Sequence, residues 1–161
     1  MKASETLRIA TPTERKVVVT RVFDAPRSLV FDAWTRPELL KRWLEAPGRS
    51  MVVCDVDLKV GGAYRFLWRG PKGKDVGMCG VYREIARPER VVRTESWEDW
   101  DAGESLVTMV LVEHDGKTTF TEIVLFPSRE VRDAVLESGL KQSATENFDR
   151  LAAFLASIPN P

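Results

Sequence analysis

Few residues of this chain have the type and spacing that catalysis or metal binding requires. The single histidine, His114, adjoins Asp115-Gly116, a dipeptide typical of a tight hairpin turn. We interpret His114 as a solvent-exposed turn residue, because no nucleophile or acid can be assigned beside it. Cys54 and Cys79 stand singly in apolar surroundings without metal-ligand spacing, which indicates buried free thiols. The sequence therefore predicts no catalytic set, no metal and no cofactor.

Charged residues on both sides of Trp97 are the remaining candidates. The acidic stretch 98–104 is more typical of a solvated loop than of a metal or proton-transfer site. In a strand, Arg93 and Glu95 would lie on the same face as Trp97, because alternate residues share a face. If that face points inward, the two charges must pair, because an unpaired buried charge is too costly. With Tyr82, they are the residues on which an enzymatic function would depend.

Composition limits the class of protein and its partners. A chain of 161 residues with 43% hydrophobic content can form one domain with a core of its own. Lys and Arg number 24, as do Asp and Glu, so the zero net charge argues against nucleic acid and anionic membranes as partners. No segment resembles a signal peptide or a membrane span. We expect a cytoplasmic protein, with a loose arm over residues 1–14 and one domain over 15–158.

The longest stretch with helical periodicity lies near the C-terminus. One helical face is apolar and consists of Leu140, Ala144, Phe148, Leu151, Ala152 and Leu155. A second apolar stripe lies upstream, within residues 131–135. At about 100° of rotation per residue, it points to a different side of the helix than the first stripe, and Ser138-Gly139 lies between the two. Glycine lowers the cost of a break there. The pattern predicts helices at 129–137 and 139–156, the second being the main packing element.

The rest of the chain has mostly the periodicity of strands. Residues 16–23 are rich in β-branched side chains and form a first strand, preceded by a short edge strand at 7–10. Two short helices within 26–43 follow, with Pro37 between them. Six further strands joined by short turns indicate an antiparallel meander. In the strand that starts at Ser50, the alternation places Val52, Cys54 and Val56 on one face.

This order of elements predicts a hollow. A twisted sheet of about seven strands curls, and the long C-terminal helix is the element available to cover its concave face. One helix rarely fills such a space, so we expect a cavity between helix and sheet. The residues predicted to contact a ligand there are Tyr64, Phe66, Trp68, Met78, Tyr82, Glu95, Trp97, Phe120, Leu140, Ala144 and Phe148.

An ordered set of short motifs also resembles a known superfamily. The motifs lie at residues 22–26, 30–35, 40–43, 61–66, 80–85, 88–92, 118–121 and 138–140. Together they resemble the START and Bet v 1-like (SRPBCC) helix-grip superfamily, and within it the branch named for the C-terminal domain of the heat-shock-protein-90 ATPase activator. The resemblance implies an α+β fold, in which a curved antiparallel sheet wraps around the long C-terminal helix and leaves a pocket. It implies no shared catalytic residues.

Three functions stay open at this point. The leading hypothesis is binding of a small hydrophobic molecule, aromatic or lipid-like, with one polar group. The second is an enzyme that acts on a hydrophobic substrate in the same pocket. The third is a protein-interaction module associated with chaperones and the stress response, with an exposed apolar surface near residues 97–100 or near Trp34 and Trp43. A protein partner and a homodimer are both compatible with the sequence.

Overall fold

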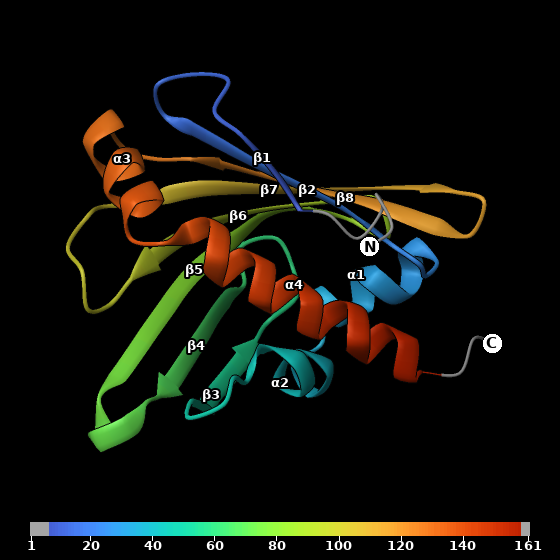
Figure 1. Ribbon diagram of the computed structural model, residues 1–161, viewed down its shortest axis with the longest axis horizontal. Coiled ribbons are helices and arrows are strands. Elements are labelled where there is room, and N and C mark those ends of the chain that lie inside the picture. Colours follow the sequence, from blue (N-terminus) through green and yellow to red (C-terminus); the bar gives the residue numbers. More distant parts are fainter. Residues whose placement is uncertain (1–6, 159–161) are drawn as a thin grey trace.

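Within residues 7–158, which the computed structural model describes, strands and helices follow the order that the periodicity predicts (Figure 1). The N-terminal elements are β1 (Arg8–Ala10), β2 (Lys16–Phe23), α1 (Arg27–Thr35) and α2 (Pro37–Leu44). The strands β3 (Ser50–Val56), β4 (Ala63–Arg69), β5 (Asp75–Ala86), β6 (Arg90–Trp97), β7 (Ser105–His114) and β8 (Lys117–Leu125) follow. The chain then forms α3 (Arg129–Glu137) and α4 (Leu140–Ser157). The predicted α+β class is confirmed, with the short edge strand β1 as an eighth strand.

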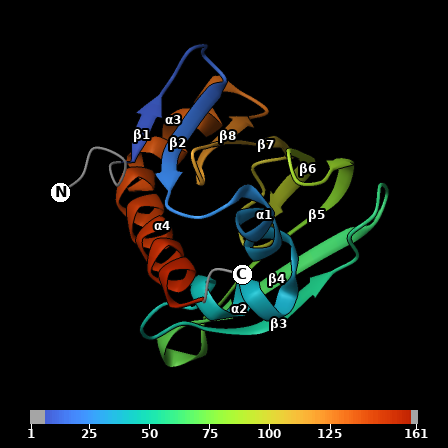
Figure 2. The ribbon, with the colours of Figure 1, turned by 90° about the vertical axis from the view of Figure 1, so that its right-hand side faces the viewer.

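The strands form one antiparallel sheet in the order β1-β2-β8-β7-β6-β5-β4-β3. Strands β3 to β8 are the predicted meander, and β2 joins the sheet beside β8, far away in the sequence. Helices α1 and α2 carry the chain from β2 to the opposite edge at β3 (Figure 2). The two helices therefore link β2, the neighbour of the edge strand β1, to the other edge strand, β3.

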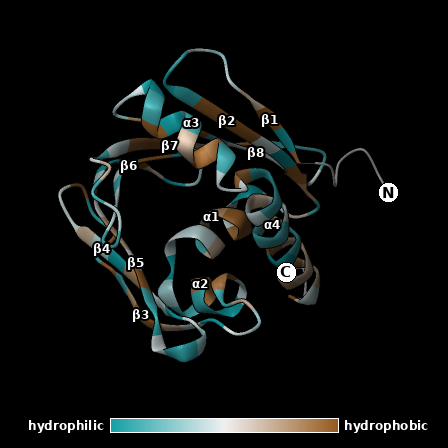
Figure 3. Ribbon diagram, turned by 60° about the vertical axis from the view of Figure 1, so that its left-hand side comes forward, coloured by the Kyte–Doolittle hydropathy of each residue, from teal (hydrophilic) through white to brown (hydrophobic). Residues whose placement is uncertain are grey.

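The sheet curls into an arc, and α4 lies across its open side (Figure 2). Register shifts between Met51 and Val53 in β3 and between Tyr82 and Glu84 in β5 mark bulges. Bulges bend a strand and increase its twist, so they help to curl this half of the sheet. Hydrophobic and hydrophilic residues alternate along the ribbon of the strands and of α4, as expected for elements that bury one face (Figure 3).

The predicted break between the two C-terminal helices is confirmed. Gly139 has a φ of 96°, in the left-handed region that favours glycine. At the start of α3, the Ser128 hydroxyl accepts a hydrogen bond from the Val131 backbone N–H at 3.1 Å, which caps that helix. The break lets α3 and α4 point in different directions, so α4 can cross the sheet (Figure 1).

The core at one end of the arc is a packed aromatic cluster. The Trp34 ring stacks on Phe120 with 4.7 Å between centroids, and Phe148 of α4 lies 5.6 Å from Phe120. Trp43 is buried, and its indole N–H donates to the Ala33 carbonyl oxygen at 2.9 Å. Each such buried side chain contributes about 1.5–3 kcal/mol by area. Because Trp34 and Trp43 are buried, the predicted docking surface on α1 and α2 is wrong.

Candidate functional site

The concave face of β4, β5 and β6 collects a second set of aromatic residues. Cross-strand pairing places Phe66 opposite Met78, and Met78 opposite Trp97. Since alternate residues share a face, Tyr64 and Trp68 lie on the same side as Phe66. The Trp68 and Trp97 rings stack with 6.3 Å between centroids and 27° between their planes. These residues form one continuous aromatic wall.

Tyr64 is held in this wall by a glycine on the neighbouring strand. Gly80 pairs with Tyr64, and a Cβ at Gly80 would lie 2.8 Å from the Tyr64 ring and 1.9 Å from the Thr94 carbonyl oxygen. The missing side chain lets the Tyr64 hydroxyl donate to that same oxygen at 2.6 Å. The Tyr64 ring therefore passes close over Gly80 of β5 and reaches the backbone of β6.

Arg93 and Glu95 bring charge onto the same face. The guanidinium of Arg93 lies 3.9 Å from the Glu95 carboxylate and 4.7 Å from the centre of the Tyr64 ring, so the predicted pairing is confirmed. Burial raises the pKa of Glu95, and the nearby guanidinium opposes that rise. Burial likewise raises the pKa of the Tyr82 hydroxyl, with which Arg93 also interacts. Arg93 is thus the centre of a buried polar group.

Glu122 is a member of this polar group that the sequence analysis missed. It lies on β8 between Val19 of β2 and Met109 of β7, on the concave face with Phe120 and Val124. The pKa of Glu122 is raised to about 7: burial is the main cause, the charge of Glu95 adds to the rise, and Arg93 opposes it. The sequence does contain one sign of this position. In the alternation of residues 118–124, Glu122 is the one charged residue among those whose side chains point inward.

The residues predicted to contact a ligand fall into two sets. Tyr64, Phe66, Trp68, Met78, Tyr82, Glu95 and Trp97 lie together on the concave face of β4–β6. Phe120 and Phe148 lie in the packed aromatic cluster with Trp34, and Ala144 is buried on α4. Leu140, at the start of α4, is half-buried against the core. We restrict the candidate site to the first set, with Arg93, Glu122 and Leu140.

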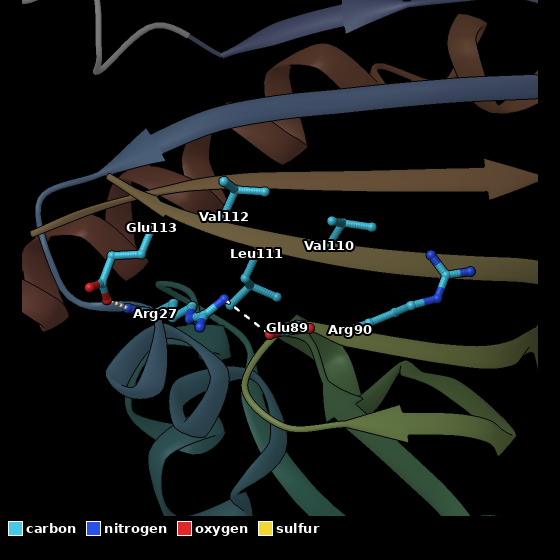
Figure 4. A pocket seen from close by; sticks show the side chains of 7 residues that line it. All are labelled: Arg27, Glu89, Arg90, Val110, Leu111, Val112 and Glu113. Atoms are coloured by element: carbon cyan, nitrogen blue, oxygen red, sulfur yellow. Dashed lines mark hydrogen bonds and ion pairs between the residues drawn. The ribbon is translucent and has the colours of Figure 1, made fainter. Parts of the chain in front are cut away.

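Two surface grooves of the described residues lie away from this site. One, of about 420 Å³, lies between α1, the β5–β6 turn and β7, and the close view labels its lining residues (Figure 4). There the Glu113 carboxylate accepts from the Arg27 backbone N–H at 2.7 Å, and Arg27 also pairs with Glu89 at 3.5 Å. The other, of about 380 Å³, lies between α1 and the end of α4. Neither groove includes the wall of β4–β6.

The histidine and the two cysteines, the other side chains that could take part in catalysis or metal binding, lie apart from one another. The His114 side chain is 89% exposed beside Asp115, which confirms the turn interpretation. Cys54 and Cys79 are free but only half-buried, so full burial was wrong. Burial raises the pKa of the Cys54 thiol to about 11, which keeps it protonated at neutral pH. Among residues 7–158, no three His, Cys, Asp or Glu side chains form a group that could hold a metal.

None of the described helices combines the length and the apolar character needed to cross a membrane. The longest, α4, carries charged and polar residues on its exposed face.

A curved antiparallel sheet closed by a long C-terminal helix defines the helix-grip class of the START and Bet v 1-like superfamily. A family model described as "Activator of Hsp90 ATPase homolog 1-like protein" matches residues 24–156. The chain belongs to that family.

Solved structures support the same assignment. A crystal structure of a Rhodobacter sphaeroides protein is 30% identical, has a TM-score of 0.89, and the match covers 96% of this chain and 100% of that one. Protein Ms6760 from Mycobacterium smegmatis is 21% identical with a TM-score of 0.81, over 95% of this chain and 100% of its own. The latter likeness shows the fold alone. No curated protein matches the chain.

Proposed function

We propose that this protein binds a small, largely apolar molecule between the N-terminal half of α4 and the concave face of β4–β6. In this proposal the aromatic wall around Phe66, Trp68 and Trp97 contacts the apolar part of the ligand. The polar group around Arg93, Glu95 and Glu122 meets its polar end. Ligand sites of this kind combine an apolar lining with a few convergent polar groups.

The observation that carries the proposal is residual exposure on the concave face. In the aromatic cluster of Phe23, Trp34, Phe120 and Phe148, the side chains are buried. On β4–β6 and β8, by contrast, Trp68 and Glu122 are half-buried, Glu95 keeps 16% of its side chain exposed and Trp97 keeps 37%. Water thus reaches inward-facing apolar and acidic side chains at this end of the arc. Displacement of that water by an apolar ligand is favourable.

A dye-binding assay with two matched tryptophan variants tests this proposal. Trp97 lies in the wall, whereas Trp100 is similarly exposed but lies in the loop after β6. We expect an apolar fluorescent dye to bind, Trp97→Ala to weaken it by about 10-fold, and Trp100→Ala to leave it unchanged. Native mass spectrometry of gently purified protein would reveal a retained ligand. Absence of both dye binding and a retained molecule would contradict the proposal.

Proton-transfer catalysis in the same site is a second candidate. The observation that favours it is the environment of Glu122, where burial raises the pKa to about 7, near the pH at which a general acid or base works best. In that case the wild-type protein would return a bound compound chemically altered, and Glu122→Gln would return it unchanged. Recovery of unaltered compound from both proteins would leave binding as the function.

A protein-interaction role is compatible with the family description, which names an ATPase activator homologue. Of the two surfaces expected from the sequence, the one that stays exposed includes Trp97 and Trp100. Trp100→Ala would weaken the binding of a chaperone at this surface, whereas it would leave the affinity for the small ligand unchanged.

A further inference from the structure

Glu122 differs from every other charged residue on the concave face in lacking a partner. Within residues 7–158, no hydrogen bond or ion pair reaches its carboxyl group. Its Cα neighbours across the sheet are Val19 and Met109, which offer no polar side-chain atom other than a thioether sulfur. The side chain is nevertheless half-buried rather than hidden, so its carboxyl group can be reached from the interior side of the sheet.

The nearby cations are already engaged with other acidic groups. Arg93 lies 3.9 Å from Glu95 and over the Tyr64 ring. Arg21, on β2, donates to Asp149 of α4 at 2.6 Å. The group of Arg93, Glu95 and Glu122 therefore contains two carboxyls and one guanidinium, and lacks one positive charge when both carboxyls are ionised. A buried site of this kind becomes neutral by taking up either a proton or a cation.

We propose that the ligand of this site carries a protonated amine, which binds the Glu122 carboxylate while its apolar part extends along the concave face toward Trp68 and Trp97. This inference rests on the proposed function and specifies the chemical class of its ligand. The amine supplies the missing positive charge and a hydrogen-bond donor for an acceptor that has none.

An anionic ligand fits the same surroundings less well. The Arg93 Nε atom lacks a partner among the described residues, but that atom is hidden from solvent, so a ligand cannot reach it. The groups that a ligand can reach are the carboxyls of Glu95 and Glu122. A ligand carboxylate would thus lie next to two acidic groups and could not reach an unpaired cation. Like charges in a buried site repel strongly.

The proposal makes binding depend on pH in a defined direction. The charged and titratable groups around Glu122 are Arg93 and Glu95 on β6, Tyr82 on β5, and the Arg21–Asp149 pair between β2 and α4. Because burial raises the pKa of Glu122 to about 7, an incoming amine must displace a proton below that pH. Amine affinity then rises by about 10-fold per pH unit up to about 7 and levels off above it.

Calorimetry with three matched probes tests this inference: 1-naphthylmethylamine, 1-naphthalenemethanol and 1-naphthoic acid. At a pH of about 8, we expect the amine to bind at least about 10-fold more tightly than the alcohol, and the acid to bind most weakly. Glu122→Gln should remove the advantage of the amine and leave the alcohol unchanged. Glu104→Gln, in the exposed loop, is the control and should change neither.

The possible outcomes separate this inference from the proposed function. Equal affinities for amine and alcohol, or tightest binding of the acid, would overturn the amine proposal and leave apolar-ligand binding in place. Failure of all three probes together with failure of the dye would overturn both. The pH dependence of the wild-type protein provides the same test without any substitution, so a poorly folded Glu122→Gln protein does not remove it.

Discussion

Arg93 and Glu95 lie two residues apart on β6, both face the concave side of the sheet, and their charged groups are 3.9 Å apart. Strand geometry alone sets this arrangement, because residues i and i+2 share a face. The pair places a positive charge deep within the protein, where Glu122 approaches from β8. We expect the balance of these three charges to affect both the stability of the fold and the class of ligand that its interior accepts.

Loss of the guanidinium should destabilise the fold strongly. Arg93→Met would leave Glu95 and Glu122 without a nearby counter-charge, and removal of one partner of a buried pair costs about 3–5 kcal/mol. The measurement is the free energy of unfolding in urea at neutral pH. Arg90→Met is the control, because Arg90 pairs with Glu84 at the surface and such pairs contribute less than about 1 kcal/mol. Similar losses in both variants would contradict the central position of Arg93.

Glu122 should make the protein less stable as the pH rises from about 4.5 to about 7. Burial raises the pKa of Glu122 to about 7, so the folded state holds its proton more tightly than the unfolded chain does. The contribution is fully present below the unfolded pKa, is lost as pH rises through the folded pKa, and amounts to up to about 3 kcal/mol. Unfolding of wild type and Glu122→Gln across this range measures the difference. Parallel pH profiles would show that Glu122 does not titrate in this way.

A methyl group at position 80 should disrupt the aromatic wall. In Gly80→Ala the new Cβ would meet the Thr94 carbonyl oxygen at 1.9 Å and the Tyr64 ring at 2.8 Å, so the strands must move apart. Overpacking of this kind costs about 1–3 kcal/mol or more. Thermal unfolding is the readout, and Gly70→Ala, whose nearest atom is 3.3 Å away, should cost much less. An unchanged melting temperature for Gly80→Ala would rule out the close approach of Tyr64.

The ion pair between Arg21 and Asp149 should hold α4 onto β2. Arg21 is buried, and its guanidinium donates to Asp149 at 2.6 Å. Asp149→Asn removes the charge that compensates a buried cation, for an expected loss of about 1–3 kcal/mol. Hydrogen exchange should then quicken along α4, whereas the exposed Glu146→Gln should leave it unchanged. Unaltered protection of α4 in Asp149→Asn would contradict this role.

Local signals account for the parts of the fold that were predicted correctly. Gly139 separates two helical stripes that one straight helix could not bury together, and the structure breaks there. Asp115-Gly116 joins β7 to β8 in register, with His114 opposite Lys117. Both features depend on a few adjacent residues whose conformational preferences agree with the final structure.

Bulges and long-range pairing account for most of what the sequence did not show. The alternation after Ser50 placed Val52 on the face of Cys54, but the bulge in β3 buries Met51 and leaves Val52 43% exposed. One inserted residue changes the face of every side chain beyond it, and nothing in the local pattern marks the position. Glu122 was missed for a related reason: its burial depends on pairing with β7 on one side and β2 on the other, and β2 is about 100 residues away in the sequence.

The indole N–H signals of the five tryptophans offer the most direct test of ligand binding at the β4–β6 wall. Trp68 and Trp97 lie in the wall, Trp34 and Trp43 lie in or beside the packed cluster, and Trp100 lies in the loop after β6. In an NMR titration with 1-naphthylmethylamine, we predict that the signals of Trp68 and Trp97 shift progressively while the other three stay in place. Shifts confined to Trp34, Trp43 or Trp100, or no shifts at all, would contradict the proposal that this protein holds its ligand beneath α4.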